Sequence, residues 1–201
     1  MCVSDSVERE CVGVVNSTVC RLVDSAKHLG PKRQSRDMSD RGQLQKEQLP
    51  LFLLYSEDGA EISGITRFQK LVFLAQQGGL EQDPIEPLED AEMFEYEPND
   101  YGPFSRELYD TLDRLVDRGH VEVNTERTPY GNERKDYSLT TKGKRRASEE
   151  FSDLPEDPED LDHSLKVLKA VKHLYNDRPI VGLIDELYAE YPEYAKDSVL
   201  K

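Results

Sequence analysis

The sequence predicts a mainly helical protein with one small β-hairpin. Two observations lead to this fold class. Apolar residues recur at helical spacing in several segments downstream of residue 44, while alternation of apolar and polar residues marks two short runs on either side of residue 130. With 201 residues, of which 36% are hydrophobic, the chain is long enough for one domain with extensions.

The chain is strongly acidic. It holds 41 Asp and Glu against 26 Lys and Arg, a formal net charge of -15, and its mean hydropathy is -0.73. Such a surface is typical of proteins adapted to high salt, and an ordinary acidic protein is the alternative. No run approaches the ~18 apolar residues of a membrane helix, and the acidic start MCVSDSVERE is unlike a secretory signal. We therefore expect a cytoplasmic protein.

The N-terminal segment differs from the rest. Residues 1–37 are nearly balanced in charge and show no sustained hydrophobic period, and they contain all three cysteines, whose spacing matches no zinc pattern. We interpret 1–37 as a disordered extension or an overlong gene start, with a small folded arm as the alternative, and we assign it no function. The main domain is expected at 38–148.

The first half of this domain predicts two helices and a short strand. The segments LQKEQLPLFLLYSEDG (44–59) and EISGITRFQKLVFLAQQGG (61–79) each have an apolar side at helical spacing and end in glycine. The polar, proline-containing stretch 80–92 is expected to be a surface loop. MFEYEP (93–98) alternates aromatic and other residues, which indicates a strand.

The second half predicts a helix, a hairpin and a further helix. YGPFSRELYDTLDRLVDRG (101–119) has one apolar stripe, and Pro103 is expected at its first helical position. HVEVNTERTPYGNERKDYSLT (120–140) contains two alternating runs around turn residues, which predicts a β-hairpin. The following helix is expected to begin at a cap formed by Thr140 or Thr141.

The C-terminal part predicts a linker and a helical pair. Residues 149–162 hold eight acidic residues and two prolines, which is typical of a linker. Residues 163–201 predict two helices. An apolar stripe through Leu165, Leu168 and Val171 must be buried, either in a homodimer seam or by packing within the chain.

The order helix, helix, helix, hairpin, helix is that of a winged helix-turn-helix domain, whose third helix is the candidate recognition helix and whose hairpin is the wing. Over roughly residues 103–147 the chain resembles winged-helix regulators of the PadR and MarR kind. The resemblance lies in the linked pattern LDRLVDRGHVEV, a hairpin and then YSLTTKG. The segments ITRFQKLVFLAQQ and FEYEPNDYGPFSRELYDTL resemble YwgA-type proteins related to the phage-associated, Panacea-type antitoxin domains. This second resemblance rests on Gln69-Lys70-Leu71 and Tyr101-Gly102-Pro103, and it implies a small helical, winged-helix-like module found near mobile elements, which in some cases acts through protein partners.

Catalytic and metal-binding motifs are missing from the sequence. There is no GxxxxGK[ST], HExxH or CxxC, and the four histidines are scattered. We therefore expect no enzyme activity, no metal site and no cofactor.

Candidate DNA contacts lie on the third helix and beyond it. On that helix they are Ser105, Arg106, Tyr109 and Arg114. Three aspartates share its exposed surface and would repel phosphate, so a solvated, charge-laced helix is the alternative. The hairpin and the next helix add seven cations, which are Arg127, Arg134, Lys135, Lys142, Lys144, Arg145 and Arg146. Such cations can bind phosphate together with backbone N–H groups at a helix start, or they can simply balance an acidic surface.

The sequence as a whole favours a winged-helix transcriptional regulator that binds double-stranded DNA. The first alternative is a protein-interaction module of the antitoxin or adaptor type that does not contact DNA, and the aspartates of the third helix favour it. A structural component of a mobile element, without catalytic activity, is a third interpretation.

Overall fold

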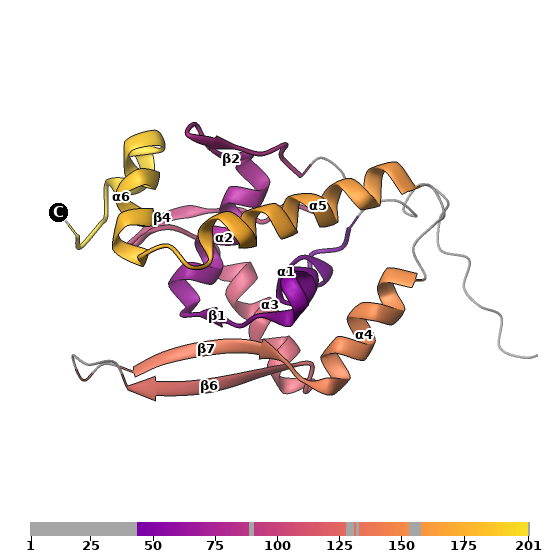
Figure 1. Ribbon diagram of the computed structural model, residues 1–201. Coiled ribbons are helices and arrows are strands. Elements are labelled where there is room, and N and C mark those ends of the chain that lie inside the picture. The colour runs from indigo at the N-terminus through magenta and orange to yellow at the C-terminus, as the bar shows by residue number, and fades with distance from the viewer. Residues whose placement is uncertain (1–43, 89–90, 128–130, 132, 153–157, 201) are drawn as a thin grey trace, which may run out of the picture. The chain divides into compact units, whose positions relative to one another are not determined.

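The computed structural model describes residues 44–88, 91–127, 131, 133–152 and 158–200 (Figure 1). The predicted N-terminal extension, residues 1–37, lies outside these ranges and stays a prediction. All described residues belong to one compact unit. None of their helices combines the length and the apolar character needed to cross a membrane.

The two predicted N-terminal helices are present. They are α1 (Gln48–Gly59) and α2 (Ile65–Gln77), with the short strand β1 (Ile62–Ser63) between them. Six consecutive residues of α1, from Leu49 to Leu54, are buried. Burial on every side is expected for a helix surrounded by other elements, and α1 packs against α2, α4, α5 and the strand β7.

The predicted hairpin is also present. It consists of β6 (Val121–Arg127) and β7 (Glu133–Leu139), paired antiparallel in a register that runs from Val121 opposite Leu139 to Arg127 opposite Glu133. We call this hairpin the wing. Strand β1 joins the free edge of β7, which gives the sheet order β1-β7-β6, and the helix α4 (Thr141–Ser152) follows directly. This order of helices around a small sheet is compatible with a winged helix-turn-helix fold.

Two sequence predictions before the third helix were wrong. Pro103 does not begin a helix, because it lies in β5 (Gly102–Phe104), which pairs with β4 (Glu97–Asn99). The predicted strand at 93–98 is displaced toward β4. The third helix, α3 (Arg106–Asp117), begins after Ser105, whose Oγ accepts the Leu108 N–H at 3.3 Å. Proline fits an edge strand as well as a first helical turn, so its presence alone did not decide between them.

The connection between α2 and α3 is long and contains two hairpins. Besides β4 and β5, it holds β2 (Gly79–Leu80) and β3 (Asp83–Pro84), in the stretch predicted to be a plain loop. A simple helix-turn-helix joins its helices by three or four residues. The geometry of α2 against α3 must therefore be set by packing and hydrogen bonds rather than by a short turn.

Two buried side chains of α2 supply these hydrogen bonds. Gln69 Nε2 donates to the Ser105 carbonyl at 2.9 Å, and its Oε1 accepts from the Ser105 N–H at 2.9 Å. Lys70 Nζ donates to the Pro103 carbonyl at 2.8 Å. Lys70 is 2% exposed, and its burial lowers its pKa to about 7. The segments around Gln69-Lys70 and Gly102-Pro103 therefore meet, and they fix the start of α3 on α2.

The C-terminal part forms α5 (Pro158–Tyr175), α6 (Ile180–Glu190) and a 3-10 turn (Pro192–Ala195). In Figure 1, α5 runs beside α1, and it packs against both α1 and α2. Because α4 continues to Ser152 and α5 begins at Pro158, helical residues take up both ends of the predicted 149–162 linker. Residues 153–157 lie outside the described part of the chain.

The predicted dimer seam is wrong in its central residues. Leu168 and Val171 are each 0% exposed within a single chain, and they pack into the same core as α1 and α2. Leu165 is partly buried. The stripe is therefore satisfied by packing within the chain, which was the competing interpretation, and a second copy cannot use Leu168 or Val171 without opening the core.

Candidate nucleic-acid interface

The segment LTTKG fixes the start of α4 against the end of α3. Thr140 Oγ1 accepts the Gly143 N–H at 3.0 Å and donates to the Gly119 carbonyl at 2.8 Å, so Thr140 rather than Thr141 caps the helix. A Cβ atom at Gly143 would lie 1.9 Å from the His120 carbonyl oxygen. No side chain fits there, because real Cβ atoms do not approach an oxygen so closely. Glycine therefore lets α4 begin directly against the loop that leads into β6.

The four cations at the start of α4 point to different partners. Lys142 Nζ donates to the Arg118 carbonyl at 2.6 Å, a favourable position for a cation at the C-terminal end of α3. Arg145 forms an ion pair with Glu149 one turn along α4. Lys144 lies beside Gly59 at the end of α1. The fourth cation, Arg146, is only partly exposed.

One carboxylate, that of Glu47 just before α1, binds three arginines. Arg118 lies 2.8 Å from Glu47 Oε2, Arg146 lies 3.4 Å from it, and Arg114 lies 3.7 Å from Oε1. Arg146 also donates to Glu150 Oε1 at 2.5 Å. Glu47 thus ties together α1, α3 and α4. Sequence reasoning missed it, because no local pattern connects a glutamate to arginines far along the chain.

His120 lies in the loop between α3 and β6, close to this cluster. It is 9% exposed, and its Nδ1 has no hydrogen-bond partner among the described residues. Burial lowers its pKa most, and the charges of Arg146 and Lys142 lower it further. His120 therefore stays neutral near pH 7 and adds no positive charge to the start of α4 at that pH.

The candidate DNA contacts on α3 are less available than the sequence suggested. Ser105 is 1% exposed and serves as the helix cap, so the prediction that it contacts DNA was wrong. Tyr109 is half-buried, with Arg106 above its ring at 5.7 Å. Arg106 also pairs with Asp110 at 3.2 Å. The exposed surface of α3 further carries Glu107, Asp113 and Asp117.

On the wing, Arg134 is held in ion pairs, whereas two other cations form none with the described residues. Arg134 donates to both oxygens of the buried Asp136 at 2.8 Å and to Glu126 at 2.9 Å, and the hydrogen bond to Asp136 raises the pKa of Arg134. Arg127 and Lys135 are exposed and form no ion pair with the described residues. Residues 128–130 and 132, between β6 and β7, lie outside the described part of the chain.

The cations of the predicted site thus fall into two groups. Those in ion pairs are Arg106, Arg114, Arg134, Arg145 and Arg146. Those exposed and without an ion pair among the described residues are Arg127, Lys135, Lys142 and Lys144, which we call the unpaired cations. All four lie on the wing or in the first turn of α4. Within the described residues, no group of His, Cys, Asp and Glu could hold a metal ion.

The fold and these cations define a small helical domain with a wing and a basic helix start. Residues 97–149 match the family model described as the transcriptional regulator PadR-like family. The match runs from β4 to α4, so it covers α3, the wing and all four unpaired cations. It supports the PadR resemblance, and the family is one of regulators rather than enzymes. The antitoxin-type resemblance is not confirmed, and no curated protein matches the chain.

Proposed function

We propose that this protein is a winged-helix transcriptional regulator that binds double-stranded DNA through its wing and the start of α4. The observation that carries the proposal is the overlap between the PadR-like match, residues 97–149, and the elements that hold the four unpaired cations. A regulator of this kind acts in the cytoplasm. Adaptation to high salt stays a prediction from the composition.

The proposed binding mode relies on phosphate contacts. The first turn of α4 offers Lys142 and Lys144 together with the electropositive end of a helix, and the wing offers Arg127 and Lys135. The exposed acids of α3 oppose close approach of a phosphate backbone to that helix. Because phosphate contacts carry no sequence information, we expect binding that depends steeply on salt and weakly on sequence.

A matched set of variants tests the proposal. Lys135→Glu combined with Lys142→Glu removes one unpaired cation from the wing and one from α4. Lys196→Glu, just after the 3-10 turn Pro192–Ala195, is the control, because Lys196 is also exposed but lies outside both the proposed interface and the α4 region. Fluorescence anisotropy with duplex DNA over a range of KCl should show weaker binding for the double variant. The negative slope of log K against log salt should become less steep by about 0.9 for each phosphate that the variant no longer binds.

A protein-interaction module of the adaptor type is the second candidate function. The exposed Asp113 and Asp117 of α3 favour it, because they present an acidic surface where a recognition helix would meet DNA, whereas the nearby Glu107 is paired with Lys46 at 2.7 Å. The same anisotropy experiment separates the two. If the wild type shows no affinity for duplex DNA at low salt, the adaptor function becomes the better one.

A further inference from the structure

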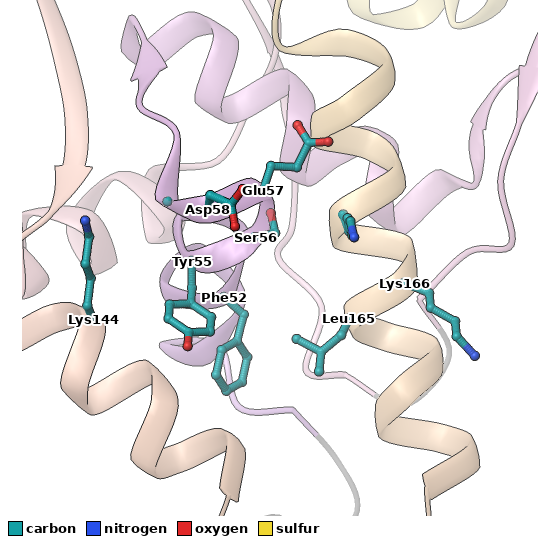
Figure 2. A pocket seen from close by; sticks show the side chains of 10 residues that line it. Phe52, Tyr55, Ser56, Glu57, Asp58, Lys144, Leu165 and Lys166 are labelled. Atoms are coloured by element: carbon teal, nitrogen blue, oxygen red, sulfur yellow. The ribbon is translucent and has the colours of Figure 1, made fainter.

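A pocket of about 840 Å³ lies between the C-terminal end of α1, the helix α4 and the helix α5 (Figure 2). Sites for small molecules have volumes of this order. The residues that matter for its chemistry are Phe52, Tyr55, Asp58, Lys144, Leu165 and Lys169. Among the described residues that line it, none belongs to the wing.

The floor of the pocket is apolar and aromatic. Tyr55 and the fully buried Phe52 line it from α1, and Figure 2 shows the side chain of Leu165 entering from α5 on the opposite side. Tyr55 is 36% exposed, although the preceding residues of α1 are buried. The exposed Tyr55 ring offers a flat surface for a planar ring.

The two rims of the pocket carry positive charge. Lys144 stands on α4 and Lys169 on α5, and both are exposed and form no ion pair with the described residues. In contrast, every described arginine from 106 to 146 except Arg127 is in an ion pair. The lining holds three lysines against the two acids Glu57 and Asp58, so it is net positive in an otherwise acidic chain, and lysine binds phosphate as a point charge.

The end of α1 forms the third side, in an unusual backbone conformation. Glu57 and Asp58 have positive φ values of 52° and 57°, in the left-handed region that non-glycine residues rarely adopt. His173 holds the Glu57 carboxylate at 2.8 Å, and Lys172 Nζ donates to the Ser56 carbonyl at 2.8 Å. Strain of this kind persists where the surrounding structure enforces it, and it is common at ligand sites.

The conformation leaves an acceptor at the pocket. Asp58 is exposed, and its carboxylate forms no ion pair with the described residues. It can accept hydrogen bonds from hydroxyl or amino groups of a ligand. The lining therefore offers three kinds of contact, to a planar ring, to a hydrogen-bond donor and to an anion.

We propose that this pocket binds a nucleotide, with the base against the exposed Tyr55 ring, a ribose hydroxyl or base amino group on Asp58, and the phosphate in the positive field of Lys144 and Lys169. An apolar ring alone would make no use of the lysines, and inorganic phosphate alone would make no use of the exposed Tyr55 ring. A nucleoside phosphate meets all three parts of the lining.

The pocket shares Lys144 with the unpaired cations of the proposed DNA interface. A bound phosphate would neutralise this lysine, so a nucleotide should weaken DNA binding. This consequence, unlike nucleotide binding itself, rests on the proposed function.

Calorimetry on the full, DNA-free chain tests the site, with AMP as the probe and adenosine and inorganic phosphate as its two halves. AMP should bind with saturation, and each half should bind at least about tenfold more weakly, because each lacks either the charge-assisted hydrogen bonds or the ring stacking. Lys169→Ala should weaken AMP binding by about tenfold, while Lys135→Ala on the wing should leave it unchanged. Lack of AMP binding at millimolar concentration, or equal binding of adenosine, overturns the proposal.

The effect of AMP on DNA binding is measured separately. If the wild type binds DNA, AMP should lower that affinity, and Lys169→Ala should remove the effect of AMP while keeping the affinity for DNA. If the chain binds AMP but no DNA, the proposed function fails and the nucleotide site stands. If it binds DNA but no AMP, the nucleotide site fails and the proposed function stands.

Discussion

Glu47 holds three arginines of α3 and α4, and its replacement by glutamine should change both stability and DNA binding. The Glu47 side chain is 28% exposed, and those of Arg114, Arg118 and Arg146 are 47%, 51% and 23% exposed. Pairs this exposed contribute roughly 0.2–1 kcal/mol each. Glu47→Gln should therefore lower the free energy of unfolding by about 1–2 kcal/mol.

The same change should strengthen DNA binding, because it removes one negative charge and releases arginines beside the start of α4. The slope of log K against log salt should steepen by about 0.9 for each additional phosphate that is bound. Urea unfolding measures the first effect, and fluorescence anisotropy over a range of KCl measures the second.

Glu149→Gln is the matched control for this experiment. Among the described residues Glu149 pairs with Arg145 alone, and the two side chains are well exposed at 67% and 72%. We expect the control to change the free energy of unfolding by less than about 0.5 kcal/mol. Equal stability losses in the two variants, or a lower DNA affinity for Glu47→Gln, would refute the role assigned to Glu47.

Three further variants test the fold that positions the interface. Gly143→Ala should push α4 away from the His120 carbonyl and cost more than about 2 kcal/mol in urea unfolding, and an unchanged midpoint would contradict the close approach. Leu168→Glu places a charge in the core, so circular dichroism should show unfolding, whereas a folded monomer obtained from a wild-type dimer would restore the seam. Lys70→Met tests the lowered lysine pKa: from about pH 7 to pH 10 the unfolded chain keeps a proton that the folded wild type has lost. The stability of wild type relative to the variant should therefore rise by about 1.4 kcal/mol per pH unit over this range. A stability difference that does not change with pH would mean that the pKa of Lys70 is not lowered in the folded chain.

Local patterns in the sequence were enough for much of the fold. The apolar period of α2, the alternation in β6 and β7 and the threonine cap of α4 all depend on residues within a few positions of one another. Pro103 was misassigned because a strand edge and a helix start both accept proline, and the early helix start then placed Ser105 on the helix instead of at its cap. The long connection between α2 and α3 left no short-range signal for the two hairpins it contains.

The candidate site was harder to predict, because its character depends on distant partners. The basic cluster from Lys142 to Arg146 was visible in the sequence, but its division into paired and unpaired cations was not. That division depends on Glu47, which reaches α3 and α4 only in the folded chain. In the same way, nothing in the period of α5 indicated that Leu168 faces α1 and α2 rather than a second copy.

The dependence of DNA binding on salt tests the central claim most directly. Anisotropy titrations of the wild-type chain with duplex DNA of unrelated sequences should be made over a range of KCl. If the four unpaired cations each bind a phosphate, log K should fall linearly with log salt for each duplex, with a slope of about -3.6, at about 0.9 per phosphate. A slope near zero, or no binding at the lowest salt, would contradict a DNA interface formed by the wing and the start of α4.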